Sequence, residues 1–422
     1  MSLMKSVLVA LLLATPLFAQ PSIDSMIDRE LPSLLDTYKS FHEEPELSLH
    51  EEKTSATLAS RLRALGYDVT EHVGGYGVVA IMRNGNGPTL LMRTDMDALP
   101  VSEQTGLPYA SRVPNVMHAC GHDIHMTTLI GTASILAQMK NRWHGTLMLI
   151  GQPAEETVQG AKAMLADGLY DRFGTPSYAI AVHDNSSLPA GQFAYCPGAF
   201  MAATDSVNII VRGLGGHGAR PELTKDPIVV ASEIVLALQT IASRETSPLD
   251  PVVVTVGAIH GGAKRNIIPD QVQLLLTVRT FKPDVRKRVL DSIERIAKGI
   301  ALAAGIPEDH APIVESIAGE SAEATFNDPA LTERIAQALK RGMGEANVVR
   351  MDPMMVSEDF GRFGLGGKIP ICDLNVGAVD PAKIASGARL PSLHSSEFAP
   401  VPDATLRGAV KGMTIAALEL LR

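Results

Sequence analysis

The amino-acid sequence predicts an α/β protein: a mostly parallel, doubly wound sheet forms the main domain, and a ferredoxin-like module is inserted into it. Strand-sized apolar runs alternate with helical stripes over most of the chain, and one central stretch has its own order of elements. The chain has 422 residues, of which 45% are hydrophobic and 20% are charged. This length allows about two to three domains, and the composition is that of a folded globular protein.

The first and last parts of the chain carry the pattern of the main domain. Apolar runs with the length of buried strands occur at 78–83, 88–93, 146–151, 178–183, 347–351 and 371–378. Helices are expected where apolar residues recur every three or four positions, at 126–139, at 328–342 and from about 403 onward. Strands that alternate with helices in this way are typical of a parallel sheet covered on both faces.

The middle of the chain predicts a separate module with the order β-α-β-β-α-β. Its expected elements are strand 203–213, a helix that begins at Asp226-Pro227, strands 251–259 and 271–280, helix 284–303 and strand 311–317. We therefore expect a main domain built from residues 20–197 and 319–422, and an inserted domain of residues 198–318.

Residues 1–19 have the pattern of a signal peptide. Lys5 provides the positive charge, Ser6 to Ala14 form a short apolar run, and Ala19 is the small residue at the cleavage site. A membrane span needs roughly 20 apolar residues, and Pro16 interrupts this run. The sequence therefore predicts export, to the periplasm or the medium, without a stable membrane anchor.

Charge and cysteine content exclude two classes of protein. The formal net charge is −9 and there is no cluster of basic residues, so we expect no nucleic-acid partner. Three cysteines cannot build a disulfide framework, which excludes a disulfide-linked structural protein. Whether Cys196 or Cys372 is oxidised is left open, and the remaining thiol, Cys120, needs its own explanation.

The segment MHACGHDIH, residues 117–125, is the strongest chemical signal. Cys120 and His122 stand two positions apart across a glycine, which is a spacing that suits two ligands of one metal ion. A buried thiol beside ordinary surface histidines is the alternative interpretation of this segment alone.

Further polar residues follow other predicted strands: Asp95 and Asp97, the adjacent Glu155 and Glu156, and His183. Open α/β sheets bind ligands at the carboxyl ends of their strands. Buried acids without a partner cost several kcal/mol, and a bound cation removes that cost. Because Glu155 and Glu156 are adjacent, we expect their side chains to point in different directions.

Seven blocks of sequence, in order, carry a resemblance to a known family: LMRTDMDALP, MHACGHDIH, GQPAEE, GLGGHGARP, NIIPD with VRT, VSEDF and LHSSEF. The chain resembles the aminoacylase and glutamate-carboxypeptidase family of dinuclear metallohydrolases, in its hippurate-hydrolase and auxin-conjugate amidohydrolase branch. The blocks extend from Leu91 to Phe398, which is nearly the whole mature chain.

The resemblance implies a site for two divalent metal ions in the main domain. Its implied ligands are Cys120, His122, Glu156, His183 and His394. Glu155 is the implied general acid/base, and Asp97 the implied carboxylate that orients a ligand. Most of the wider family has a metal-binding histidine where this chain has Asp95, so whether Asp95 touches metal is open. Zinc, manganese and nickel all remain candidates.

The resemblance also implies roles for the inserted domain as a lid and dimerisation domain. Asn266 and Arg279 are implied to hold the substrate carboxylate, and His217 to stabilise the tetrahedral oxyanion, often from the partner subunit of a homodimer. The chain departs from the branch at HDNSSLPAG after His183, at Glu222 and at Val356, which leaves the acyl-group preference open.

We therefore expect an exported, metal-dependent amidohydrolase that cleaves N-acyl amino acids, such as hippurate-like substrates, to a carboxylic acid and a free amino acid. The expected mechanism is attack by a metal-bound hydroxide, with Glu155 moving the proton. A metallocarboxypeptidase acting on short peptides is the alternative enzyme. A non-catalytic metal- or ligand-binding protein of the same fold is the alternative outside enzymes.

Overall fold

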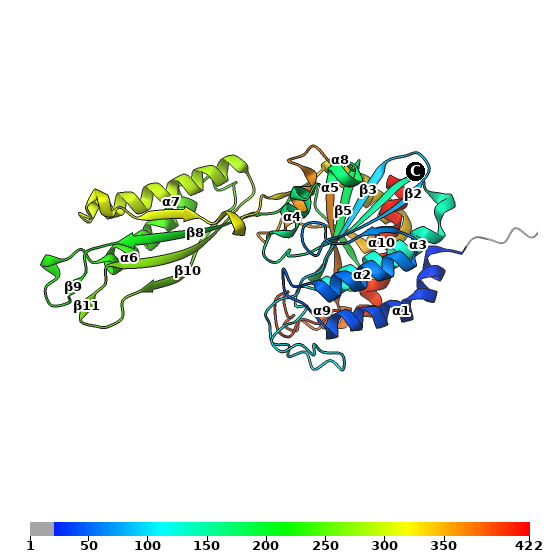
Figure 1. The fold of residues 1–422 in the computed structure, drawn as a ribbon, viewed down its shortest axis with the longest axis horizontal. Helices are drawn as coiled ribbons and strands as arrows, with labels where there is room; N and C mark the ends of the chain where they lie inside the picture. The colour runs from blue at the N-terminus through cyan, green and yellow to red at the C-terminus, as the bar shows by residue number, and fades with distance from the viewer. Residues whose placement is uncertain (1–20) are drawn as a thin grey trace, which may run out of the picture.

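The computed structural model describes residues 21–422, so the predicted signal peptide at 1–19 lies outside the described residues. The described chain forms two lobes joined by a narrow connection (Figure 1). The larger lobe contains both the first and the last described helices, and the smaller lobe is built from the middle of the chain.

An eight-stranded mixed sheet forms the centre of the larger lobe. Its strands, in spatial order, are β1 (Asp68–Thr70), β2 (Val78–Asn84), β4 (Gly145–Gln152), β3 (Thr89–Asp95), β5 (Tyr178–Pro189), β16 (Ile371–Val379), β6 (Phe193–Tyr195) and β15 (Val348–Arg350). The four central strands, from β4 to β16, are all parallel. Antiparallel pairs occur at β1–β2, β2–β4 and β16–β6. The prediction of a mostly parallel α/β sheet is confirmed.

Helices cover both faces of this sheet, as expected for a doubly wound domain. One face packs against α1 (Ile23–Glu43), α2 (Glu52–Ala64), α3 (His122–Gln138), α8 (Pro329–Met343) and α10 (Pro402–Leu420). The opposite face packs against α4 (Gly160–Ala166), α5 (Leu169–Phe173) and the short helix Asp359–Gly364. Alternate residues of β2 enter the two cores, which is the period-2 pattern of a strand.

The smaller lobe has the predicted ferredoxin-like order of elements. They are β8 (Ala203–Arg212), α6 (Pro227–Thr240), β10 (Val252–Gly261), β12 (Gln271–Thr280), α7 (Pro283–Ala303) and β13 (Ile313–Ser316). The strands form an antiparallel sheet in the order β10-β12-β8-β13. At its far end, β9 (Gly216–His217) pairs with β11 (Ile267–Ile268) (Figure 1).

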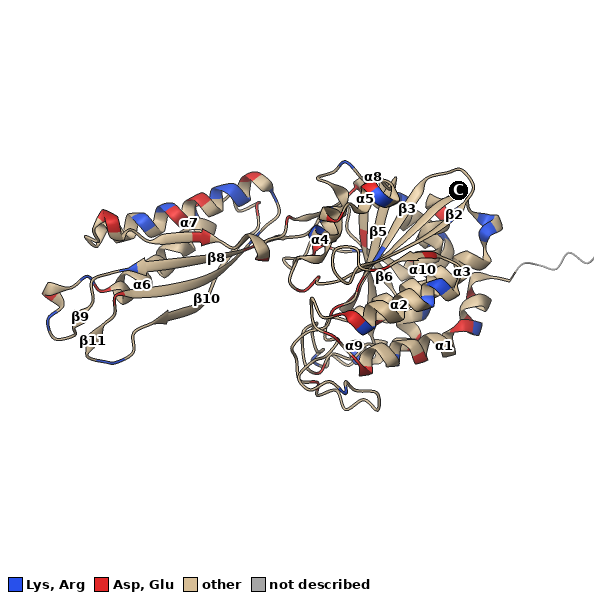
Figure 2. Ribbon diagram, in the orientation of Figure 1, with Lys and Arg blue, Asp and Glu red and all other residues tan. Residues whose placement is uncertain are grey.

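Helix α7 shows how this lobe separates its core from solvent. Its inner residues, such as Val289 and Ile293, are buried in the core of the lobe. Basic and acidic residues alternate along its outer face (Figure 2) and form ion pairs one turn apart, such as Lys287 with Asp291. The lobe therefore has a hydrophobic core of its own.

Three short elements complete the connections of the larger lobe: β7 (Gly198–Met201), β14 (Thr325–Asn327), which pairs with β7, and α9 (Pro381–Ala385).

Among the described residues, one helix, Pro227–Glu245, is long and apolar enough to cross a membrane on length and composition alone. It consists of α6 and the π-helical turn that continues it, and 33% of its most apolar window is buried in the protein. The absence of a membrane anchor remains a prediction.

Candidate metal centre and catalytic pocket

The predicted metal ligands meet at the start of α3, beside the end of β4 and the middle of β5. Cys120 precedes α3, His122 begins it, Glu156 follows β4, and His183 lies within β5. Cys120 Sγ lies 3.2 Å from Nε2 of His394 and 3.6 Å from Nε2 of His183. Glu156 connects the two sides of the site, because its carboxylate lies 3.5 Å from His394 and 3.8 Å from His122.

The local backbone at the start of α3 makes this meeting possible. Gly121 has a left-handed backbone, with φ of 77°. A Cβ atom at this position would lie 2.4 Å from Oδ2 of Asp184, so a larger residue would displace that carboxylate. Glycine between Cys120 and His122 therefore allows both side chains to face the same site.

In the two predicted ligands His122 and His183, backbone hydrogen bonds engage the Nδ1 nitrogen and leave the Nε2 nitrogen for the site. Nδ1 of His122 donates to the backbone oxygen of Asp97 at 2.7 Å, and Nδ1 of His183 donates to the backbone oxygen of Asp184 at 2.8 Å. In each ring the Nε2 atom is then the one available to bind a metal ion. Metal-bound histidines commonly have this second hydrogen bond, which sets the tautomer and the orientation of the ring.

The chemistry of the donor set fits divalent cations. Nε2 of His122 and Oε1 of Glu156 are buried and have no hydrogen-bond partner among residues 21–422, although buried polar atoms normally have one. Burial opposes a charge on His122, but Asp95 and Asp97 raise its pKa to about 10. Burial and the carboxylates of Glu156 and Glu155 raise the pKa of Cys120 well above its usual value. This surplus of negative charge favours cations, and a cation favours the thiolate form of Cys120.

Asp95, whose role was open, already has partners for both carboxylate oxygens. One oxygen accepts from Nη1 of Arg93 at 2.7 Å, and the other accepts from Nδ1 of His125, also at 2.7 Å. Nε2 of His125 accepts from the backbone N–H of Asp184. Asp95 and His125 thus form a supporting chain behind His122 and His183.

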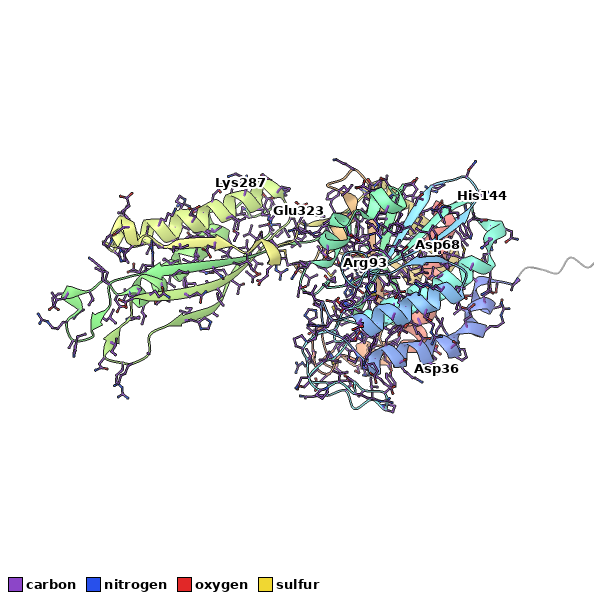
Figure 3. The ribbon with its side chains drawn as sticks, in the orientation of Figure 1. Asp36, Asp68, Arg93, His144, Lys287 and Glu323 are labelled. Atoms are coloured by element: carbon purple, nitrogen blue, oxygen red, sulfur yellow. The ribbon has the colours of Figure 1, made fainter. Side chains whose placement is uncertain are left out.

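Arg93 holds a buried cluster of acids beneath the site, in the interior of the larger lobe (Figure 3). Its guanidinium binds Asp95 and Glu358 at 2.7 Å each and lies 3.4 Å from Asp359. Glu155 lies close to Glu358 and Asp359. Burial and the negative charge of Glu358 raise the pKa of Glu155 well above its usual value. A carboxyl group in this setting holds a proton more readily, as a general acid/base requires.

Asp97 organises the backbone that carries the two adjacent glutamates. Its Oδ1 accepts from the N–H of Glu155 at 3.1 Å and its Oδ2 from the N–H of Glu156 at 2.9 Å. Glu155 and Glu156 were expected to point in different directions, but both carboxylates lie within 3.9 Å of Nε2 of His122. The reason is the turn before them, in which Ala154 has a left-handed φ of 51°.

A cavity of about 610 Å³ opens over these groups. It is lined by Cys120, Glu155, Glu156, His183 and His394 on the side of the larger lobe, and by Arg279 from β12 of the smaller lobe. Arg279 is half-buried, and its Nη1 donates to Oγ of Ser357 at 2.6 Å. The structure therefore brings Arg279 to the same cavity as the predicted metal ligands.

His217 and Asn266 lie together, but away from this cavity. Ile267, next to Asn266, pairs with His217 in the β9–β11 ribbon, and the N–H of Gly218 donates to the backbone oxygen of Asn266. Arg279 pairs with Thr204 at the opposite end of the ten-residue strand β8, so about 30 Å separates the two ends. Within one chain, Asn266 and His217 do not join Arg279.

Several residues of the site were missed from the sequence: Arg93, His125, Asp184, Ser357 and Glu358. All but Asp184 belong to the blocks that carry the family resemblance, so the blocks themselves were the available signal. Asp184 follows the predicted ligand His183 directly. Apart from the local bonds of Arg93 with Asp95 and of Asp184 with His183, their hydrogen bonds to other site residues cross many positions of sequence, which spacing alone does not reveal.

Comparisons with known proteins show the family of this chain. Residues 91–395 match the family model "Peptidase family M20/M25/M40". Hippurate hydrolase of Campylobacter jejuni is 40% identical over 342 residues, which cover 79% of this chain and 87% of that protein. Thermostable carboxypeptidase 2 of Saccharolobus solfataricus is 37% identical over 340 residues, covering 78% and 82% of the two chains.

A solved structure shares both the fold and the expected kind of site. The crystal structure of the Bacillus subtilis YxeP protein, described as a dinuclear metal-binding peptidase of the M20 family, has a TM-score of 0.78 and 29% identity. The likeness covers 93% of this chain and 99% of that chain. With the donor cluster found here, it supports two divalent metal ions. The chain is a metal-dependent amidohydrolase and belongs to the peptidase family M20/M25/M40.

Proposed function

We propose that this protein is an exported amidohydrolase that cleaves N-acyl amino acids into a carboxylic acid and a free amino acid. One observation carries the proposal: one cavity is lined by Glu155, by Arg279 and by four of the five predicted metal donors, which are Cys120, Glu156, His183 and His394. The hippurate hydrolase of Campylobacter jejuni, 40% identical to this chain, supports this class of substrate. Bound divalent cations supply water activation and polarisation of the amide carbonyl.

Glu155 performs the proton transfers in this proposal. Its carboxylate accepts the proton of the attacking water and passes it to the amide nitrogen, so that the amine leaves neutral. The surrounding acids Glu358, Glu156 and Asp359 favour the protonated form of Glu155, which makes it an effective proton donor in the second step. Asp97 keeps the backbone of Glu155 in place during both transfers.

Arg279 recognises the free carboxylate of the substrate. Arginine offers two parallel N–H groups to a carboxylate, and Ser357 holds one end of this guanidinium. The lining of the cavity includes the apolar side chains of Met201, Met354 and Val356, which suit the acyl group. It also includes Asn185 and Ser187, which suit an uncharged polar side chain on the amino acid.

We further propose that the protein works as a homodimer through the smaller lobe. His217 and Asn266 lie at the far end of that lobe, too far to serve the cavity of their own chain. In a homodimer they reach the cavity of the partner, where His217 stabilises the oxyanion and Asn266 assists Arg279.

The proposal of export to the periplasm or the medium rests on residues 1–19 alone. Zinc, manganese and nickel are the metals to test.

The experiment compares hydrolysis of N-benzoylglycine and N-acetylated amino acids with hydrolysis of dipeptides, each with zinc, manganese or nickel supplied. Faster cleavage of N-acyl amino acids supports the proposal. Faster cleavage of dipeptides supports a carboxypeptidase instead, the activity named for the relative from Saccharolobus solfataricus. Protein that binds metal but cleaves none of these substrates would refute both.

A further inference from the structure

We propose that Glu51 is a positioning residue for the catalytic turn, which we define as residues 153–156. It holds the backbone in front of Glu155 and Glu156 and thereby sets the direction of both side chains. The inference rests on the roles proposed above for Glu155 and Glu156. It concerns a residue that lies outside every sequence block carrying the family resemblance.

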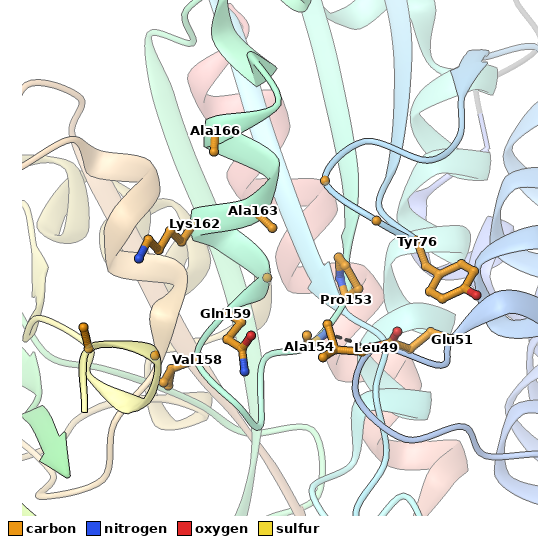
Figure 4. Close-up of a pocket in the computed structure, with 15 residues that line it drawn as sticks. Leu49, Glu51, Tyr76, Pro153, Ala154, Val158, Gln159, Lys162, Ala163 and Ala166 are labelled. Carbon is orange, nitrogen blue, oxygen red and sulfur yellow. Dashed lines mark hydrogen bonds between the residues drawn. The ribbon is translucent and has the colours of Figure 1, made fainter. Parts of the chain in front are cut away.

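The contact is direct and buried. Oε1 of Glu51 accepts a hydrogen bond from the backbone N–H of Ala154 at 2.7 Å (Figure 4). Glu51 and Ala154 are both completely buried. Since Asp97 accepts from the N–H groups of Glu155 and Glu156, two carboxylates bind three consecutive N–H groups of the catalytic turn.

The turn needs such an acceptor because its backbone is strained. Ala154 has a φ of 51°, a left-handed conformation that costs a residue with a side chain roughly 1–2 kcal/mol. The carbonyl oxygen of Ala154 accepts from the N–H groups of Gln159 and Gly160, which holds the peptide group after Ala154. Glu51 holds the peptide group before it, so the turn cannot relax without breaking the hydrogen bond between Ala154 and Glu51.

The fold gains little else from the Glu51 carboxylate. Glu51 stands at the N-cap position of α2, yet its side chain makes no capping hydrogen bond to that helix. Its second oxygen, Oε2, is buried and has no hydrogen-bond partner among the described residues, and burial raises the pKa of this carboxyl to about 7. A buried carboxyl with one unsatisfied oxygen destabilises a protein. Within the described part of the chain, the side chain of Glu51 is hydrogen-bonded to one other element of the site, the catalytic turn.

The same chain segment supports Asp97, the other carboxylate of the turn. Oγ of Ser48 donates to Oδ2 of Asp97 at 2.6 Å, and the N–H of Ala98 donates to the backbone oxygen of Glu46. Glu46, by contrast, uses its side chain to bind N–H and Oγ1 of Thr54 within α2. Glu46 therefore supports the helix without touching the catalytic turn, which makes it a matched control.

The experiment measures metal affinity by chelator competition, and kcat and KM with N-benzoylglycine, for Glu51→Ala, Glu51→Gln and Glu46→Ala. Loss of a supporting hydrogen bond at a metal site typically costs about 10–100-fold in affinity or activity. We expect Glu51→Ala to weaken metal binding and kcat by that factor with KM nearly unchanged. Glu51→Gln should recover most of both, since its amide oxygen can accept from Ala154, whereas Glu46→Ala should only lower the melting temperature.

Three results would overturn the proposal: wild-type metal affinity and kcat in Glu51→Ala, equal losses in Glu46→Ala, or no recovery in Glu51→Gln. If Glu51→Ala does not fold, Glu51→Asp replaces it, because its carboxylate is one methylene too short for Ala154 and should show the same losses. Metal affinity is measured without substrate. A wrong substrate assignment would therefore appear as an inactive wild type with the same ranking of metal affinities among the variants.

Discussion

The sulfur of Cys120 lies 3.2 Å from Nε2 of His394, although 274 positions of sequence separate the two residues. The contact depends on local backbone geometry as well as on the fold. His394 has a left-handed φ of 66°, and its N–H donates to the backbone oxygen of Ala119. The C-terminal segment is thus tied to the loop that carries Cys120, and this tie brings His394 to the other predicted metal donors.

Replacing His394 should weaken metal binding without unfolding the protein. The side chain is 56% exposed, so His394→Ala removes a metal donor but little buried surface. We expect metal analysis to show fewer bound equivalents than in the wild type, with an unchanged melting temperature for metal-free protein. His260→Ala, an exposed histidine of the smaller lobe, is the control and should bind metal as the wild type does.

Glu155→Gln should separate metal binding from catalysis. Glutamine preserves the size of the side chain but cannot accept and return a proton, so turnover should fall about 10²–10⁴-fold. Metal content should stay that of the wild type, because the proposed ligands are unchanged. A Glu155→Gln protein with more than about a tenth of wild-type turnover would contradict the role of Glu155 as general acid/base.

Arg279→Ala should impair only substrates with a free carboxylate. A hydrogen bond to a charged group contributes about 1.5–3 kcal/mol, so kcat/KM for N-benzoylglycine should fall about 10–100-fold. The matched control is the C-terminal amide of the same compound, which lacks the carboxylate. The variant and the wild type should cleave this amide at equal, low rates, and a larger loss on the amide would assign Arg279 another role.

His217 should act on the site of the partner subunit. Neither Glu155→Gln nor His217→Ala should be active as a homodimer, but a mixed dimer has one site with both residues intact. Co-refolding the two inactive variants in equal amounts should restore about a quarter of wild-type activity, since about half of the dimers are mixed. No recovery, together with a monomer in sedimentation, would remove this role of His217.

The buried pair of His42 and Glu103 should make stability depend on pH. Nδ1 of His42 lies 2.6 Å from Asp123 and its Nε2 lies 3.3 Å from Glu103. Burial opposes the charge of His42, but hydrogen bonds to Asp123 and Glu103 raise its pKa from 6.5 to about 10. Burial likewise opposes ionisation of Glu103, but hydrogen bonds from His42 and Thr105 lower its pKa from 4.5 to about 2.

The stabilisation from this pair is therefore complete between pH 4.5 and 6.5. This stabilisation declines by about 1.4 kcal/mol per pH unit as pH rises from 6.5 toward 10. In this range the unfolded chain has lost the His42 proton, whereas the folded chain still holds it. The stabilisation also declines as pH falls from 4.5 toward 2, where Glu103 becomes protonated. In urea unfolding of metal-free protein, the deficit of His42→Gln should be larger at about pH 5.5 than at about pH 9. An equal deficit at both values would contradict the charge on His42.

The sequence predicted the fold well where the signal was local. Strand β4 was expected at 146–151 and is found at Gly145–Gln152, and helix α7 was expected at 284–303 and is found at Pro283–Ala303. Buried strands and amphipathic helices repeat with periods that depend on the chain geometry alone. The antiparallel edge of the main sheet was not expected, because strand direction depends on which strands pair.

The site was predicted in part. Cys120 and His122 were recognisable from their spacing, and the family blocks identified Glu155 and Arg279. Glu51 was not recognised, because it lies in the acid-rich segment FHEEPELSLHEE, where a buried glutamate looks like its exposed neighbours. Its contact with Ala154 spans 103 positions, and no local pattern carries that information.

By itself, the sequence determined the periodic elements, the order of the two lobes and the kinds of side chains that could bind metal. Only the tertiary structure decided which of them meet: Arg279 enters the cavity, whereas His217 and Asn266 lie at the far end of the smaller lobe. The physical reason is the distance along the chain over which each kind of interaction acts. Backbone geometry acts over a few residues, but contacts such as Cys120 with His394 arise only when whole sheets and helices pack together.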